Sequence, residues 1–466
     1  MASHDEATKS HEVIVVLVPF PAQGHLNQLL HFSRHISSHK IPVHYVSTII
    51  HTRQAKTRVH GWDPVSISNT MIQFHEFETP TFESPLPNPH AATKFPSHLQ
   101  PSFEAALFLR EPVAKLLSAL SPTAKRVVVI HDYLMASVIQ DVASLPNGEA
   151  YSFHPVSTFI FSAYVWAIVG TPVEIDDEIL KRIPSHETTS TPELREFTNR
   201  QMEHQKYSSG AIFNTCRAIE APFLDVLAKV NARQWAIGPL NAVQILNTSN
   251  EQHKDKCLQW LDNQAPDSVI FVSFGTTTSL TDEQIHALAI GLESSGQKFI
   301  WVLRDADKGD IFTVDVRVCE LPEGYENRIE SSGQGKILRG WAPQVEILAH
   351  ASTGGFMSHC GWNSCMESIT MGVPLATWPM HSDQPFNALL VTRVLKIGVV
   401  VMDWACRDEL VESLAIEKSV RMLMASIEGK EMRKRAAELG DAVKKSVAEG
   451  GDTRREFDDF IAHIHR

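Results

Sequence analysis

Unbroken apolar runs that lead through a glycine-containing turn into a helical pattern occur in both halves of the chain. In the first half, VIVVLVPF (13–20) runs through PAQGH into a pattern of leucines at helical spacing that begins at Leu26. In the second half, VIFVSFG (269–275) precedes TDEQ (281–284), which has the form of a capping box. Such apolar runs are expected of parallel strands that helices cover on both faces.

Shorter strand candidates alternate with helix-length patterns along the rest of the chain. They are VHYVST (43–48), RVVVIHD (126–132), AIFNT (211–215), KFIWVLR (298–304), KILRGW (336–341) and GGFMSH (354–359). Strands that alternate with helices are typical of βαβ units and parallel sheets. The pattern therefore predicts an α/β protein with two doubly wound, Rossmann-like domains.

The weakest pattern between the two halves is the polar, Asn-rich stretch LNAVQILNTSNEQHKD. We interpret it as an interdomain linker at 241–255. The expected organisation is then a first domain at 1–240 and a second domain at 256–445. A charged helical tail closes the chain, and we expect residues 446–466 to form a helix that packs back on the first domain.

Composition excludes several classes of protein. The 466 residues have 43% hydrophobic and 21% charged residues and a net charge of −12, without a basic run that would suit nucleic acid. Six scattered cysteines without a CxxC pair fit a reducing compartment. The N-terminus lacks a signal pattern, and the apolar run at 159–170 is too short to span a bilayer. We expect a cytoplasmic monomer.

In open α/β sheets, ligands bind beyond the carboxyl ends of the strands. There, GGFMSHCGWNSCMESI (354–369) predicts a strand, a glycine turn and a helix start, which suits an anion such as phosphate. His359, Asn363 and Ser364 could add side-chain donors, and Glu367 could accept hydrogen bonds from the ribose diol. The spacing S-x-x-E at 364–367 also fits a plain capping box, a structural role.

The surroundings of this stretch favour a ligand. WAPQ (341–344) opens the segment with an indole that could stack on a planar base, and Asp383 and Gln384 close it with groups that bind sugar hydroxyls. The whole segment, 341–384, resembles the 44-residue signature box of plant UDP-glycosyltransferases. The resemblance implies the two-domain GT-B fold and a hexosyltransferase that uses UDP-sugars.

Roles for the box residues follow from this resemblance, position by position. Trp341 would stack on uracil beside Ala342 and Gln344, and Glu367 would bind the ribose. His359, Asn363 and Ser364 would bind the diphosphate, and Trp362, Asp383 and Gln384 the sugar. The resemblance also associates glutamine at the last position with glucose and histidine with galactose, with UDP-xylose as a competing donor.

The first half of the chain is expected to supply the catalytic base. His25 lies at a predicted helix start, where the helix dipole favours a neutral ring that can accept a proton. An isolated histidine at such a position is usually only solvated, but His25 matches the catalytic histidine of the family. Asp132, at the end of RVVVIHD, matches the aspartate that orients it. Replacing Asp132 with asparagine is expected to lower activity less than loss of His25.

Two further stretches are weaker candidates. Thr276, after Gly275 on a predicted turn, is expected near the diphosphate, although a helix-capping role fits equally well. NTCRAIE (214–220) is similar to a family stretch, and we interpret it as structural. No acidic pair with metal-ligand spacing occurs in the box, so we expect neither a metal nor a cofactor besides the UDP-sugar.

The acceptor is the least constrained part of the prediction. Many plant members have a proline and a methionine soon after the histidine, whereas this chain reads HLNQLL. With IHDYLMAS around Asp132, it is similar to the zeatin O-glycosyltransferase branch, which implies an inverting transfer of glucose or xylose to the cytokinin zeatin. A flavonoid or other phenolic acceptor is the rival. Another class, a catalytically silent UDP-sugar-binding protein, also stays open, and a dehydrogenase is disfavoured because no GxGxxG follows either leading strand.

The regions at 60–120 and 170–205 match the family poorly, and we expect them to shape the acceptor pocket. Phenylalanines in the first region could form an apolar slot, or could simply pack the core. They are Phe74, Phe77, Phe82, Phe95 and Phe103.

Overall fold

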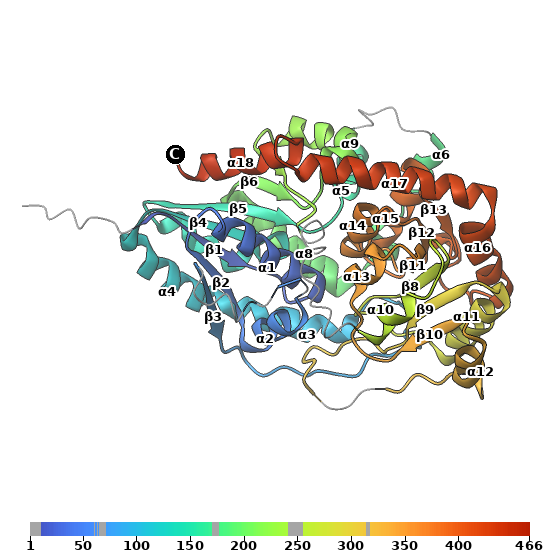
Figure 1. The fold of residues 1–466 in the computed structure, drawn as a ribbon. Coiled ribbons are helices and arrows are strands. Elements are labelled where there is room, and N and C mark those ends of the chain that lie inside the picture. Colours follow the sequence, from blue (N-terminus) through green and yellow to red (C-terminus); the bar gives the residue numbers. More distant parts are fainter. Residues whose placement is uncertain are drawn as a thin grey trace, which may run out of the picture.

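The computed structural model contains two parallel sheets, each covered by helices (Figure 1). It describes residues 11–59, 61–62, 64, 71–169, 177–240, 255–313 and 317–466. The predicted linker at 241–255 lies outside the described residues except for Asp255.

The first sheet has seven strands in the order β3-β2-β1-β4-β5-β6-β7. The strands are β1 (His11–Val18), β2 (Val43–Thr48), β3 (Ile72–Phe77), β4 (Ala124–Asp132), β5 (Gly148–His154), β6 (Ser208–Phe213) and β7 (Gln234–Ala236). The helices of this domain are α1 (Gln23–Ser37), α2 (Ile49–Arg58), α3 (Gln100–Ala106), α4 (Arg110–Leu120), α5 (Thr158–Val169), α6 (Asp177–Leu180), α7 (His186–Thr189), α8 (Pro192–His204) and α9 (Arg217–Val230).

The second sheet has six strands in the order β10-β9-β8-β11-β12-β13. The strands are β8 (Val269–Ser273), β9 (Lys298–Val302), β10 (Gly335–Leu338), β11 (Thr353–Ser358), β12 (Leu375–Thr377) and β13 (Gly398–Val400). The helices are α10 (Lys256–Leu261), α11 (Asp282–Ser295), α12 (Tyr325–Ser332), α13 (Gln344–Ala349), α14 (Trp362–Met371), α15 (Gln384–Leu389), α16 (Ser413–Ala425), α17 (Ile427–Val447) and α18 (Asp452–Ile464).

The apolar run of β1 is explained by burial on both of its faces. Val13, Val15 and Leu17 belong to one core cluster, whereas the alternate residues of the strand belong to another. Because side chains alternate along a strand, a strand covered by helices on both sides needs apolar residues at every position. The parallel strand predicted at 13–20 is therefore present as β1, which begins and ends two residues earlier, and burial on both faces explains its apolar run.

The last helix lies against the first domain although it follows the second domain in sequence (Figure 1, red). Phe457 and Phe460 of α18 enter the core of the first sheet, and the indole N–H of Trp235 donates to Asp459 at 2.9 Å. The chain thus crosses between the domains twice, and α18 adds a second covalent path that keeps them together.

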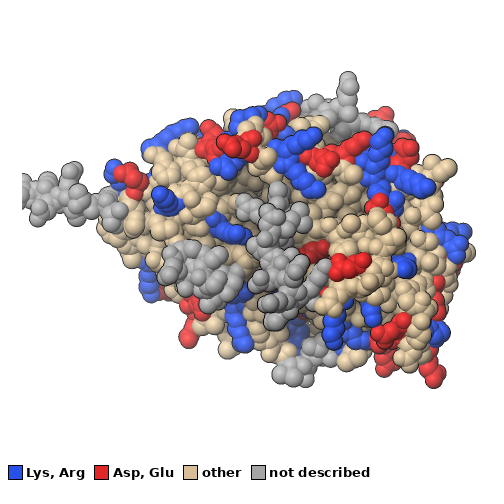
Figure 2. Space-filling model, in the orientation of Figure 1, with Lys and Arg blue, Asp and Glu red and all other residues tan. Residues whose placement is uncertain are grey.

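The surface view shows Lys and Arg interspersed with Asp and Glu over the described part of one face (Figure 2). Within the described ranges, none of the helices combines the length and hydropathy that crossing a bilayer requires.

Candidate active site

A cavity of about 660 Å³ lies between the two domains, and its lining comes from both. The carboxyl ends of β1, β4, β8 and β11 lead into the segments that line it. This is the place where parallel α/β sheets bind ligands, as expected from the strand pattern.

The structure brings His25 and Asp132 together at the first-domain wall of this cavity. His25 Nδ1 lies 2.7 Å from Asp132 Oδ2, across 107 residues of sequence. Asp132 is fully buried, and its Oδ1 accepts the backbone N–H of Leu134 at 3.0 Å. Since a carboxylate only accepts, a neutral His25 ring has its proton on Nδ1, and its Nε2 then has the lone pair that a general base needs.

On the opposite wall, α14 begins at Trp362 directly after the turn that follows β11. His359 packs against glycine at two places, because a Cβ at Gly275 or Gly361 would lie 2.6 Å from its Nε2. Burial lowers the pKa of His359 to about 4, so the ring is neutral near pH 7 and has one N–H to donate. Thr276 also lines the cavity here, beside Gly275 at the carboxyl end of β8.

The base and ribose part of the expected donor site is formed by α13 and α14. The amide of Gln344 donates to Ser364 Oγ at 3.1 Å and to Glu367 Oε2 at 2.6 Å. Trp341 is 42% exposed, and Ala342 lines the cavity beside it. A partly exposed indole near the hydroxyl and carboxylate groups of α14 is suited to a nucleoside.

We predict that UDP-glucose affinity rises as pH increases through about 7. Burial raises the pKa of Glu367 to about 7, against the opposing hydrogen bond from Gln344. Ribose hydroxyls donate hydrogen bonds, so the ionised carboxylate present above this pH binds them better than the acid present below it. Calorimetry from one pH unit below to one above this value measures the effect, and Glu367→Gln should remove it. An unchanged pH profile in that variant would assign the titration to another group.

The end of the box holds a carboxylate and an amide of fixed orientation. Asp383 accepts from Asn387 at 2.7 Å, and burial raises the pKa of Asp383. Gln384 Oε1 accepts the backbone N–H groups of Met380 at 2.8 Å and His381 at 3.1 Å. Its Nε2 therefore faces His381 Nε2, at 3.2 Å, and one amide hydrogen is left to donate to a ligand.

The polar side-chain atoms of Trp362 and Asn363 are directed toward the first domain. The indole N–H of Trp362 donates to the carbonyl of Asn214 at 2.8 Å, and Asn363 Nδ2 donates to the carbonyl of Gly24 at 2.8 Å. These contacts across the domain boundary were not anticipated from the sequence, which assigned both residues to the donor.

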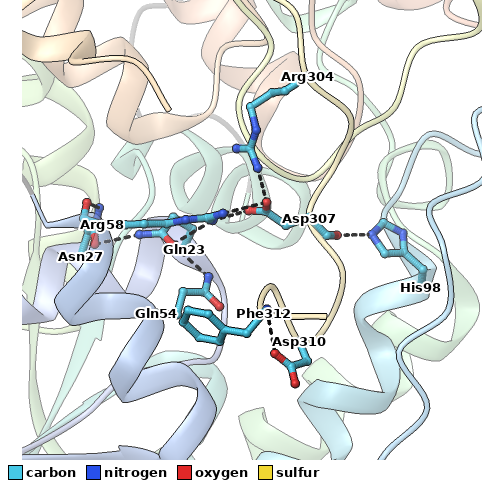
Figure 3. A network of polar contacts seen from close by, with 9 residues as sticks. All are labelled: Gln23, Asn27, Gln54, Arg58, His98, Arg304, Asp307, Asp310 and Phe312. Carbon is cyan, nitrogen blue, oxygen red and sulfur yellow. Dashed lines mark hydrogen bonds and ion pairs between the residues drawn. The ribbon is translucent and has the colours of Figure 1, made fainter. Parts of the chain in front are cut away.

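A second network of polar contacts joins the two domains and was not predicted from the sequence (Figure 3). Arg58 at the end of α2 pairs with Asp307 of the second domain at 2.5 Å, and Arg304 pairs with the same carboxylate. The Arg58 guanidinium also lies over the Trp341 ring, 4.8 Å from its centroid. Arg58 is followed by poorly patterned sequence and is 249 residues from Asp307, so no local signal connects the two.

The part of the cavity expected to hold the acceptor is lined by both apolar and polar side chains. Of the five predicted phenylalanines, Phe95 and Phe103 line it, and Phe103 also belongs to a core cluster. Phe74 and Phe77 pack against core clusters without lining the cavity, and Phe82 lies beside Gly309 of the second domain. Residues 186–202, around α7 and α8, supply the other wall, with polar and apolar side chains. These are His186, Thr189, Ser190, Leu194, Arg195, Thr198, Asn199 and Met202.

The stretch 214–220 has a structural role through Glu220. Its fully buried carboxylate accepts the backbone N–H groups of Thr158 at 3.0 Å and Phe159 at 2.8 Å, where α5 begins. Burial raises the pKa of Glu220.

Comparison with known proteins agrees with this geometry. Two family models match: "Glycosyltransferase, N-terminal domain" at residues 11–242 and "UDP-glucoronosyl and UDP-glucosyl transferase" at residues 236–417. Zeatin O-glucosyltransferase of Phaseolus lunatus is 53% identical over 100% of both chains. Zeatin O-xylosyltransferase of Phaseolus vulgaris is 51% identical, also over 100% of both. The chain belongs to the UDP-glycosyltransferase family.

A solved structure supports the same conclusion for the fold. A UGT transferase from Siraitia grosvenorii in complex with UDP is 27% identical, with a TM-score of 0.74 over 98% of this chain and 100% of that one. The predicted pair of Rossmann-like domains and the predicted UDP-dependent glycosyltransferase activity are both confirmed. The family defines the donor as a UDP-sugar.

Proposed function

We propose that this glycosyltransferase moves glucose from UDP-glucose to the side-chain hydroxyl of a cytokinin such as zeatin, with inversion at the anomeric carbon. The observation that carries the proposal is the His25–Asp132 pair at 2.7 Å on the wall of a cavity that also contains the signature box. A base on one domain and a nucleotide-binding helix start on the other suit direct transfer between two bound substrates.

In this mechanism His25 Nε2 takes the proton of the acceptor hydroxyl as its oxygen attacks the anomeric carbon. The new C–O bond forms while the bond from that carbon to the diphosphate oxygen breaks, and UDP leaves with the electron pair. Asp132 holds Nδ1–H and stabilises the imidazolium that forms. The α14 start, Ser364 and neutral His359 would stabilise the diphosphate charge, and an α-linked donor gives a β-glycoside.

The sugar would be bound by Asp383 as acceptor and Gln384 as donor. We expect UDP-glucose to be used, and UDP-xylose to compete because it lacks only the hydroxymethyl group. Gln384→His should lower the rate with UDP-glucose more than the rate with UDP-galactose, since the change replaces an amide whose orientation is fixed by three hydrogen bonds. The two specificity constants measure the effect, and an unchanged ratio would show that Gln384 does not discriminate between these sugars.

Zeatin as acceptor is supported by the two Phaseolus relatives, whose names give zeatin as the substrate. The cavity offers an apolar slot with Phe95 and Phe103 on one side and polar groups of α8 on another. Such a slot suits a planar base with a short hydroxylated chain. A flavonoid or other phenol is the second candidate, because the same apolar walls would hold a planar phenol.

An acceptor panel tests this proposal. Zeatin, dihydrozeatin, flavonols and isoflavones are supplied at equal concentration with UDP-glucose, and products are measured by mass spectrometry. We expect the cytokinins to be glucosylated fastest. Faster reaction of any phenol would contradict the cytokinin assignment, and no turnover with any acceptor would favour a silent UDP-sugar-binding protein.

We also propose that the protein acts as a monomer in the cytoplasm. All six cysteines are free thiols and five of them are buried, which suits a reducing compartment.

A further inference from the structure

Gln28 lies one helical turn after His25, in the stretch HLNQLL of α1. It is 2% exposed, although it borders the cavity. A buried amide in the first turns of the helix that carries the base needs partners for two N–H groups and one oxygen.

All three hydrogen-bonding groups of the Gln28 side chain are satisfied by other segments. Its Nε2 donates to the carbonyl of Pro155 at 3.2 Å and, through a shorter contact, to Asn363 Oδ1. Its Oε1 accepts from Asn214 Nδ2 at 2.6 Å. The orientation of the amide follows from these partners, because a backbone carbonyl such as that of Pro155 can only accept.

The Asn363 side chain also contacts α1 at a second residue. Its Nδ2 donates to the carbonyl of Gly24, the residue before His25, at 2.8 Å. A Cβ at Gly24 would lie 3.3 Å from that nitrogen, so the two helix starts approach closely. Both ends of the Asn363 amide are therefore bound to α1, on either side of His25.

We propose that Gln28 and Asn363 are positioning residues that set the distance between the base on α1 and the donor bound at the start of α14. The proposal rests on the proposed roles of His25 and of the signature box. The side chain of Asn363 then serves the domain interface, while Ser364 and the helix start serve the diphosphate. Transfer requires the reacting atoms within about 3–3.5 Å of each other, so a small shift of one domain against the other is expected to affect turnover more than binding.

The network includes a third amide, that of Asn214, which further constrains how α1 and α14 are placed relative to each other. Asn214, at the end of β6, donates to Gln28 and also accepts the N–H of Leu240 at 3.2 Å on its side-chain oxygen. Its backbone carbonyl accepts the indole N–H of Trp362. A proline or an aliphatic residue at position 28 would leave three buried polar groups without this partner, and α14 could then settle in another position.

A double-mutant cycle tests the proposal with Gln28→Leu, Asn363→Ala and the double variant. Rates are measured with UDP-glucose and whichever acceptor the wild type uses fastest, so that failure of the cytokinin assignment does not affect the outcome. Each single variant is expected to lower kcat about tenfold or more while the calorimetric affinity for UDP changes little. The double variant should lose clearly less than the product of the two single losses, because both changes remove the shared Gln28–Asn363 contact.

Gln284→Leu is the matched control for loss of a buried glutamine. Its amide makes two hydrogen bonds of 2.9 Å to Val411, both within the second domain. This variant should lower the melting temperature without lowering kcat. Hydrogen–deuterium exchange should increase at residues 23–30 and 361–366 in Gln28→Leu, and only around residue 411 in the control.

Three outcomes would overturn the proposal. In the first, the losses of kcat in the two single variants multiply in the double variant. In the second, Gln28→Leu keeps its kcat and only its melting temperature falls, as in the control. In the third, Asn363→Ala loses UDP affinity but keeps kcat at saturation, which would make Asn363 a diphosphate ligand. If Gln28→Leu does not fold, Gln28→Asn keeps the amide but shortens its reach, and the same loss of kcat is expected. Failure of the base assignment itself would be seen separately, in His25→Ala.

Discussion

Replacing His25 with alanine should lower kcat by about two to four decades, the usual contribution of a general base. The reason is that the acceptor hydroxyl then has no group on the first-domain wall with a lone pair held in place by a buried carboxylate. Affinity for UDP-glucose should change little, because the expected donor contacts lie in the second domain. Calorimetry with UDP-glucose and initial rates at saturation separate the two quantities.

His39→Ala is a suitable control for this experiment. His39 follows the end of α1, packs edge-on against Phe457 and does not line the cavity. Its loss should leave kcat near the wild-type value. A His25→Ala enzyme with more than about half of wild-type turnover would remove His25 from the mechanism.

The sequence predicted those parts of the site that depend on strand ends and on contiguous segments. His25 and Asp132 both follow apolar runs that form neighbouring parallel strands, so their meeting at one sheet edge could be expected. Gln344 and Glu367 were both assigned to the nucleoside by the resemblance of one short segment, and in the structure they share a hydrogen bond of 2.6 Å.

The rest of the site depends on how the two domains sit against each other. The Arg58–Asp307 pair joins residues 249 apart, and the Gln28–Asn363 contact joins residues 335 apart. Neither has a local pattern, since each partner alone is an ordinary polar residue near a helix end. For the same reason the sequence could assign Asn363 to the helix start but could not show that its side chain turns toward α1.

The sequence also could not show which of the phenylalanines would pack only in the core and which would line the cavity. Phe74 and Phe77 lie on β3, an edge strand, and both pack against core clusters rather than facing the cavity. Phe95 lies in a loop and Phe103 in α3; both line the cavity, and Phe103 also belongs to a core cluster. Aromatic content alone does not distinguish these two outcomes, because both bury the ring.

The structure changes the expectation for Asp132→Asn, which we now predict to lower kcat by about two to four decades, as much as loss of the base. Asp132 Oδ1 accepts the N–H of Leu134, whereas Oδ2 lies 2.7 Å from His25 Nδ1. An asparagine must keep its oxygen at Leu134, so its NH₂ group faces Nδ1 and donates to it. His25 then carries its proton on Nε2, the atom that should accept the proton of the substrate.

Asp132→Ala distinguishes this tautomer effect from a simple loss of orientation. Without an amide at position 132, the ring can take either tautomer, so the alanine variant should retain more activity than the asparagine variant although it removes more atoms. Nitrogen-15 shifts of labelled histidine should place the His25 proton on Nδ1 in the wild type and on Nε2 in Asp132→Asn. If Asp132→Asn proves more active than Asp132→Ala, the carboxylate acts only by holding the ring in place. Since Leu134 loses its acceptor in the alanine variant alone, melting temperatures of both variants show whether the difference in rate has a structural origin.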